Sequence, residues 1–161
     1  MTSEVEDWGG DAALQLAMEI EEIGRDFYEA LGSLLEDPRA AKLCRDLEKE
    51  EANHYRTFRN LHSRLAERGE TVMVSEESIA AARQTARHRV IPGKTEILRL
   101  VSAGGISEVF AIAIEMERDA VNYYRTLARQ TSASNSDVLQ AIIREEERHL
   151  DQLLAASASE N

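Results

Sequence analysis

Apolar residues recur every three or four positions along four long stretches of this 161-residue chain. That spacing gathers them on one face of an α-helix and therefore predicts helices. The predicted helices cover about residues 12–35, 38–68, 106–131 and 137–156. Asp37 and Pro38 are typical of a helix start, and we expect Asn135, Ser136 and Asp137 to cap the last helix.

The four helices form two hairpins, residues 11–69 and 106–156, joined by a connection of about 36 residues at 70–105. In this connection we expect a short helix over about 75–89 and a second one capped by Thr95 and ending at Gly104 and Gly105. One long crossover between two helical hairpins is what a ferritin-like bundle requires. We therefore predict a single all-α domain, a ferritin-like four-helix bundle. The remaining parts are an acidic leader at 1–10 and a frayed tail at 157–161.

The second hairpin repeats the first in sequence. Residues 17–31 match 113–127 at an offset of 96, with Ala, Glu, Tyr and Leu in common. Residues 43–58 match 138–153 at an offset of 95, and both contain Glu-Glu-x-x-His. Such self-similarity predicts that the two halves pack about a pseudo-twofold axis.

Six polar side chains interrupt the apolar stripes that should face the core. They occupy matching positions of the repeat and are Glu21, Glu51, His54, Glu117, Glu146 and His149. Four buried carboxylates would repel one another and lose their hydration unless they were protonated or bound to metal. Two divalent cations would balance their charge, and a Glu and a His three residues apart can hold one ion together. Glu22 is the alternative candidate to Glu21 as the ligand from this helix, but the register of the repeat favours Glu21.

Composition limits the classes of partner and metal site that this chain can have. The net charge of −11 argues against a general nucleic-acid binder, which needs a basic surface. The single cysteine, Cys44, allows neither an internal disulfide nor a four-cysteine iron or zinc site. Carboxylates with imidazoles suit iron or manganese, with zinc as a substitute. The chain has no apolar run of about 18 residues and its start is acidic, so we expect a cytoplasmic protein without a membrane segment.

The crossover carries an unusual charge. Its residues 79–105 hold five basic side chains against one acid, Glu96, which makes this segment positive within an acidic chain. We interpret it as a basic belt that lies over the bundle or over a partner subunit, with a binding patch for an anionic ligand as the alternative.

The pattern Glu-x6-Tyr followed by Glu-x-x-His, present twice, resembles the ferritin-like domain of the rubrerythrin family. The resemblance covers nearly all of the chain outside the tails and the crossover. It implies a di-iron centre bound by the six residues above, with Glu51 and Glu146 as bridging carboxylates. It also implies that Tyr28 and Tyr124 hydrogen-bond ligand carboxylates.

Two features depart from full-length rubrerythrins. Those proteins carry a rubredoxin domain that supplies electrons, and this chain lacks the cysteines for one. They also place an extra glutamate one turn after the ligand of the third long helix. Here that position is Ala120, and its repeat counterpart is Gly24. The resemblance therefore implies a more symmetric centre than that of a peroxide-reducing rubrerythrin.

The resulting expectation is a di-iron redox protein that reduces O₂ or H₂O₂ and takes electrons from an external donor such as a rubredoxin-like protein. The alternatives are iron handling (ferroxidase activity, delivery or sensing) and hydroxylation of an organic substrate. We expect a homodimer, because rubrerythrin-like domains commonly pair, and no nucleic-acid or membrane partner. The neighbouring acids Glu50, Glu145 and Glu147 are expected on a solvated face.

Overall fold

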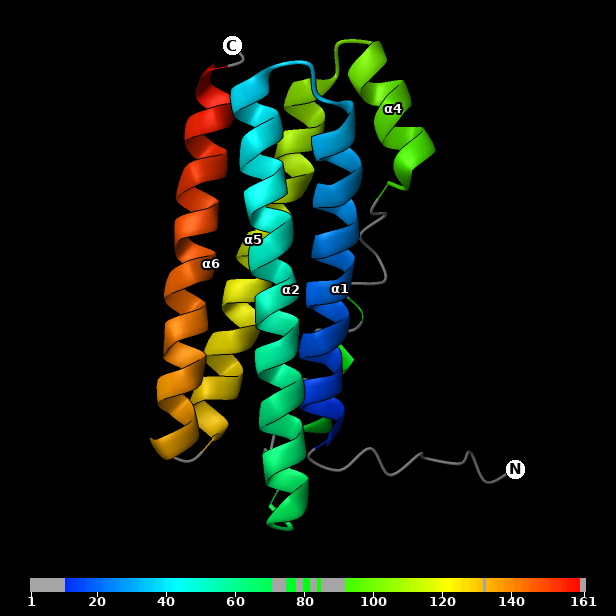
Figure 1. Cartoon of the computed structure of the whole chain (residues 1–161). Coiled ribbons are helices and arrows are strands. Elements are labelled where there is room, and N and C mark those ends of the chain that lie inside the picture. Colours follow the sequence, from blue (N-terminus) through cyan, green and yellow to red (C-terminus); the bar gives the residue numbers. More distant parts are fainter. Residues whose placement is uncertain are drawn as a thin grey trace, which may run out of the picture.

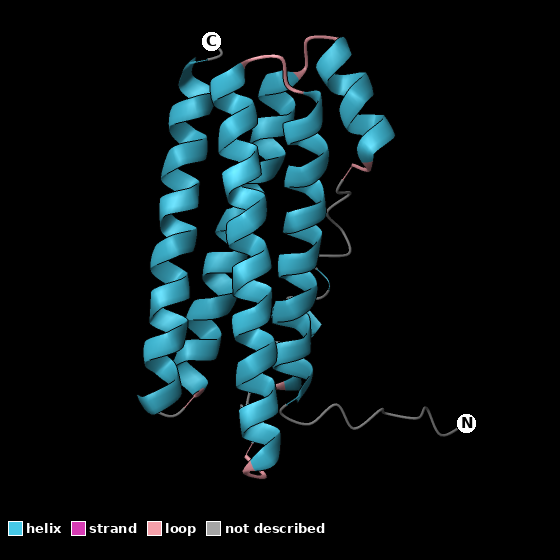
Figure 2. Cartoon of the chain, viewed as in Figure 1, coloured by secondary structure: helices cyan, strands magenta, loops and turns pink. Residues whose placement is uncertain are grey.

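The computed structural model describes residues 11–70, 75–77, 80–81, 84, 92–131 and 133–159. Regular structure in this part of the chain is helical, and no strand occurs in it (Figure 2). The helices are α1 (Asp11–Leu34), α2 (Pro38–Glu67), α4 (Lys94–Ser102), α5 (Ile106–Gln130) and α6 (Ala133–Ser159). No described helix is long and apolar enough to cross a membrane.

The four long helices stand side by side as a bundle (Figure 1). Helices α1 and α2 form one antiparallel hairpin and α5 and α6 the other (Figure 1). Helix α2 ends at the opposite end of the bundle from the start of α5, so the crossover has to run the length of the bundle (Figure 1). This architecture confirms the predicted all-α bundle of two hairpins joined by a long crossover.

The start of α2 agrees with its sequence signal. The Asp37 carboxylate accepts hydrogen bonds from the backbone N–H groups of Arg39 and Ala40, and Pro38 stands at the first helical position. Both features satisfy or remove N–H groups that lack a partner inside the helix.

Helix α4 packs against α1 and α5 and buries Ile97. It begins at Lys94 after Gly93, so Thr95 lies inside its first turn and the predicted Thr95 cap is wrong. The extended backbone at Gly93 already provides the helix start without a side-chain cap. The predicted helix over 75–89 and most of the basic side chains of the crossover lie outside the described residues, although residues 76–77, 80–81 and 84 are helical.

Helix α6 is longer at both ends than predicted. It begins at Ala133, so Asn135, Ser136 and Asp137 lie within its first turns and the predicted cap is wrong. Polar residues are tolerated there because the first N–H groups of a helix have no partner inside it. The helix continues to Ser159, so residues 157–159 of the predicted frayed tail are helical. Alanine is the best helix former, and the alanines of this last segment favour its continuation.

Two hydrophobic clusters make up the core, and a polar layer lies between them. One cluster contains Phe58, Tyr124 and Leu139, and the other contains Tyr28 and Phe110, all fully buried. Each such side chain stabilises the fold by roughly 1.5–3 kcal/mol through the apolar area it removes from water. The two clusters therefore hold the four helices at fixed positions on both sides of the polar layer.

Candidate metal centre

The polar layer consists of the six side chains that interrupt the apolar stripes. All six are at most 4% exposed, and they are Glu21, Glu51, His54, Glu117, Glu146 and His149. Each of the four long helices contributes at least one of them. In α2 and α6 the spacing of three residues turns a Glu and a His towards the same side of the helix. The structure therefore brings together every candidate ligand that the sequence predicted.

These side chains form two overlapping groups of potential metal ligands. One group is Glu21, Glu51, His54 and Glu146, and the other is Glu51, Glu117, Glu146 and His149. Within each group the ligand atoms lie within 4.8 Å of one another. Glu51 and Glu146 belong to both groups, which is the placement expected of carboxylates that bridge two ions.

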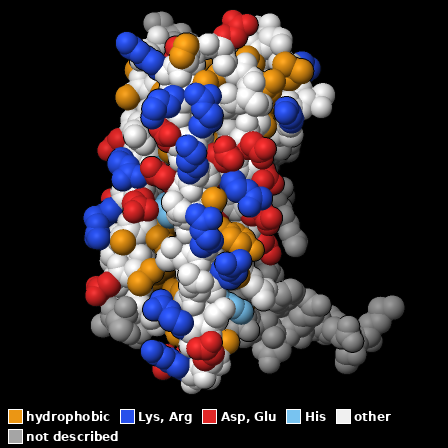
Figure 3. All heavy atoms as spheres, in the orientation of Figure 1, with side chains coloured by type: hydrophobic (Ala, Val, Ile, Leu, Met, Phe, Trp, Pro, Cys, Tyr) orange, Lys and Arg blue, Asp and Glu red, His pale blue; other side chains and the backbone are white. Residues whose placement is uncertain are grey.

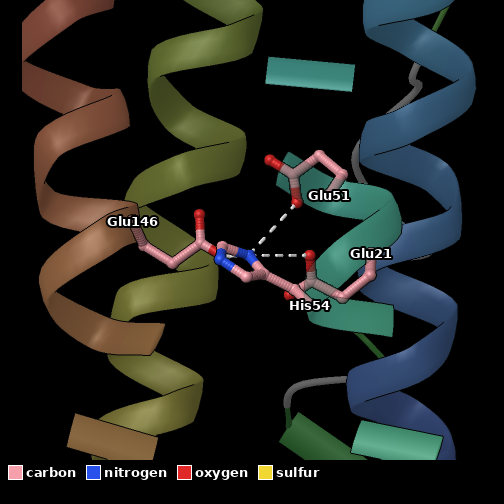
Figure 4. Close-up of side chains that lie close together, drawn as sticks. All are labelled: Glu21, Glu51, His54 and Glu146. Atoms are coloured by element: carbon pink, nitrogen blue, oxygen red, sulfur yellow. Dashed lines mark ion pairs between the residues drawn. The ribbon is translucent and has the colours of Figure 1, made fainter. Parts of the chain in front are cut away.

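The two histidines contact equivalent sets of carboxylates, and the individual distances differ between the halves. His54 Nδ1 lies 2.8 Å from Glu146, 3.4 Å from Glu21 and 3.8 Å from Glu51 (Figure 4). His149 Nδ1 lies 3.0, 3.4 and 3.8 Å from Glu146, Glu51 and Glu117, respectively. The two rings stack with their centroids 5.6 Å apart. The pseudo-twofold relation of the sequence repeat is thus present in the geometry of the centre.

The outer nitrogen of each histidine contacts a carboxylate from the other hairpin. His54 Nε2 lies 2.6 Å from Glu145, and His149 Nε2 lies 2.5 Å from Glu50. A carboxylate accepts hydrogen bonds, so each Nε2–H donates, and each Nδ1 can direct its lone pair to the centre.

The expectation that Glu50 and Glu145 lie only on a solvated face is therefore wrong. Each is half-buried, because the contact with a histidine holds one side of its carboxylate. A sequence signal existed, since the first Glu of Glu-Glu-x-x-His is present in both halves. Glu147 does pair at the surface, with Arg125.

The two predicted tyrosine contacts are present. Tyr28 donates a hydrogen bond to Glu117, and Tyr124 donates one to Glu21. Each bond joins α1 to α5, and both phenols are fully buried. They hold one oxygen of each carboxylate in place and leave the other oxygen to face the centre.

Burial and mutual repulsion perturb the acids of the centre. Burial, followed by the charge of Glu146, raises the pKa values of Glu21, Glu51 and Glu117 well above their usual range. Burial acts in the same direction on Glu146, but the two neighbouring imidazoles outweigh it and lower its pKa. The centre therefore places one ionised carboxylate between two imidazoles.

The pKa values of the two imidazoles shift in the direction opposite to the one that burial alone would cause. Burial lowers the pKa of His54, but its contacts with Glu146 and other carboxylates outweigh this and raise the pKa to about 9. The same balance raises the pKa of His149 far above its usual value. The negative charge of the surrounding carboxylates thus favours a positive charge at each imidazole, which a proton or a metal ion can supply.

The arrangement of lone pairs fits metal ions. Glu21 Oε2, both oxygens of Glu146 and the Nδ1 atoms of His54 and His149 are buried without a hydrogen-bond partner among the described residues. Buried polar atoms are almost always paired, so a cluster of unpaired acceptors that converge on one another calls for cations. Carboxylate oxygens with imidazole nitrogens match the preferences of iron and manganese.

The space beside the centre is occupied by small residues. A Cβ atom added at Gly24 would lie 3.4 Å from the carboxyl carbon of Glu51. Its repeat counterpart, Ala120, is also buried. Neither position adds a fifth carboxylate, so both halves contribute the same types of ligand. Cys44 lies in one of the hydrophobic clusters, away from the centre, where burial raises its pKa to about 12.

A protein-family model described as rubrerythrin matches residues 12–157. The match includes the crossover and all six buried polar residues. No curated protein and no solved structure gave a match to the chain.

Proposed function

The chain belongs to the rubrerythrin family, and from this membership and the geometry of its centre we propose that it is a di-iron redox protein that reduces hydrogen peroxide or O₂. The observation that carries the proposal is the pair of overlapping ligand groups that share Glu51 and Glu146. A centre built for one ion would need neither the second histidine nor the second pair of carboxylates.

In this proposal the six buried residues hold two iron ions. Glu21 and His54 would hold one ion, Glu117 and His149 would hold the other, and Glu51 and Glu146 would be shared between them. When bound, the two ions supply the two electrons that convert hydrogen peroxide and two protons into two water molecules.

The remaining residues position and insulate these ligands. Tyr28 and Tyr124 keep one oxygen of Glu117 and of Glu21 occupied by a hydrogen bond, so that each acid directs its other oxygen to an ion. Glu50 and Glu145 hold the histidine rings through their outer nitrogens. The hydrophobic clusters on both sides restrict the access of water to the centre.

In this proposal, a separate electron donor returns the centre to its reduced state. The chain's single cysteine cannot build a four-cysteine iron site of the rubredoxin type. We therefore propose an external donor such as a rubredoxin-like protein. The homodimer expected from the resemblance stays a proposal, and sedimentation at micromolar concentration tests it: a monomer would contradict it.

Iron handling is the alternative function, and the net charge of −11 favours it because acidic surfaces attract cations. One experiment separates the two. The protein is loaded anaerobically with two Fe(II) per chain and mixed with H₂O₂ or O₂, with and without a chemical reductant. Repeated consumption of the oxidant with reductant supports the redox enzyme.

The other outcomes of this experiment are equally informative. A single stoichiometric oxidation without further turnover supports iron handling. Failure of both oxidants to react with the iron-loaded protein would refute the redox proposal. Replacing Glu146 with Ala should abolish the reaction, whereas replacing Glu22, the exposed neighbour of Glu21, should leave it unchanged.

A further inference from the structure

The symmetry of the centre breaks at the outer contacts of the two histidines. One oxygen of Glu50 accepts from both His149 Nε2 and the Arg148 guanidinium, each at 2.5 Å. The corresponding acid of the other half is Glu145, which contacts His54 Nε2. Among the described residues, His54 is the one basic side chain within ion-pair distance of Glu145.

The repeat explains this difference. At the offset of 95, Arg148 corresponds to Asn53, which cannot supply a positive charge. Asn53 instead accepts a hydrogen bond from Arg56 on its own helix. Glu50 corresponds to Glu145, and His149 corresponds to His54, so the groups that the cation acts on are the same in both halves.

The surface around these contacts carries both signs of charge. On the face where α2 lies in front, Lys and Arg side chains stand among Asp and Glu (Figure 3). Arg148 is half-exposed and Glu50 is about one-third exposed, so solvent weakens their interaction but the shared oxygen keeps it at contact distance.

A carboxylate that accepts a hydrogen bond from the outer N–H of a metal-bound histidine makes the inner nitrogen more basic, and hence a stronger ligand for the metal. In the described part of the chain, no Lys or Arg competes with His54 for Glu145, so Glu145 can exert this effect fully. At Glu50, Arg148 donates a hydrogen bond to the same oxygen as His149. Its positive charge partly neutralises this carboxylate and so weakens the effect of Glu50 on His149. The tyrosine contacts are alike in the two halves, so they do not offset the difference.

We propose that Arg148 makes the two metal positions unequal, so that the ion held by Glu21, Glu51, His54 and Glu146 is bound more tightly than its neighbour. This inference rests on the proposed two-metal centre. It assigns Arg148 the role of a positioning residue, which acts on the metal through Glu50 and His149.

The test uses Co(II), because paramagnetic Co(II) shifts the Nε2–H proton signals of the histidines that bind it in the proton NMR spectrum. Less than one equivalent of Co(II) is added to the metal-free full chain, and the intensities of the two shifted signals are compared. Spectra of Glu50→Gln and Glu145→Gln at full Co(II) loading assign the signals, since each variant changes one outer contact. In the unmodified protein we expect the His54 signal to exceed the His149 signal by about threefold or more. This is less than the roughly 10–100-fold loss that follows removal of such an outer contact, because Arg148 weakens the contact without removing it.

Two reciprocal variants provide the decisive comparison. Arg148→Asn installs the residue of the other half, and Asn53→Arg installs the cation beside Glu145. Each should bring the ratio of the two signals close to one, and the double variant should reverse it. Arg148→Lys keeps the charge and should retain most of the original ratio.

The outcomes separate this inference from the function on which it rests. A ratio near one in the unmodified protein, or a ratio that neither Arg148→Asn nor Asn53→Arg changes, would overturn it. If Arg148 only supported the fold, its replacement would lower the melting temperature and leave the ratio as it was. Failure of the unmodified chain to bind two Co(II) ions would overturn the two-metal centre itself, together with this inference.

Discussion

Metal ions should stabilise this protein strongly, and the effect should depend on the shared carboxylates. The perturbation is the addition of Fe(II), Mn(II) or Zn(II) to protein that has been stripped of metal. An ion that binds the folded chain but not the unfolded one adds about 4 kcal/mol at a thousandfold excess over its Kd. For a domain of this size 1 kcal/mol corresponds to roughly 2–4 °C, so the melting temperature should rise by about 8–16 °C.

The structure says which substitutions should remove this rise. Glu51 and Glu146 each belong to both ligand groups, so Glu51→Ala or Glu146→Ala takes a ligand from both ions. The same substitutions also change the interactions among the buried charges of the stripped protein, so the melting temperature of the stripped protein alone does not report the loss of a ligand. The informative quantity is the increase on metal addition, which calorimetry or a dye-based melting assay measures.

Matched controls lie next to the ligands along the chain. Glu22 adjoins Glu21 and is exposed, while Glu147 adjoins Glu146 and pairs with Arg125 at the surface. Glu22→Ala and Glu147→Ala should leave the increase nearly unchanged. If these two variants lost it while Glu51→Ala and Glu146→Ala kept it, the ligand assignment would be wrong.

Further predictions concern the buried groups. Stripped protein should lose stability as the pH rises from about 6.5 to 9: His54, whose pKa the fold raises from 6.5 to about 9, keeps a proton that the unfolded chain releases, an effect of up to about 3 kcal/mol. Urea unfolding across this range measures it, and a stability that increased would contradict it. Tyr124→Phe should cost about 1–3 kcal/mol by the same method, because a buried carboxylate loses its donor, whereas Tyr55→Phe on a half-buried ring should cost less. The Cys44 thiol, with its pKa raised to about 12 by burial, should react with a thiol reagent only after unfolding, so rapid labelling of the native protein would disprove its burial. Gly24→Ala should add up to about 1 kcal/mol of helix stability and preserve the increase on metal addition, since the added Cβ would come no closer than 3.4 Å to a ligand carboxylate; a lost increase would show that the position needs glycine.

The ends of helices were predicted less well than their extent, because capping signals rest on a few residues. The cap expected at Asn135, Ser136 and Asp137 is wrong because α6 begins at Ala133. Polar residues at a helix start are compatible both with a cap and with the first turn, so their identity does not decide between the two. Long apolar periodicity was a better guide, because many residues contribute to it and one position alters it little.

The contacts of Glu50 and Glu145 show a second kind of limit. Their place in the sequence, beside a ligand on a helix, indicates a side chain that points away from the stripe. Whether such a side chain meets water or the opposite hairpin depends on how far apart the helices stand and how each is rotated. The distances of 2.5 and 2.6 Å to the histidines depend on that arrangement.

By itself the sequence determined the helical class, the repeated hairpins and the six polar residues that had to be buried together. Those properties follow from the period of a helix and from the cost of burying charge, which act along the chain or on single side chains. The tertiary structure alone decided which oxygen faces which nitrogen, and that Arg148 reaches Glu50 whereas Glu145 has no comparable cation among the described residues. Contacts of this kind join groups about a hundred residues apart, and the packing of the hydrophobic clusters brings them within hydrogen-bond distance.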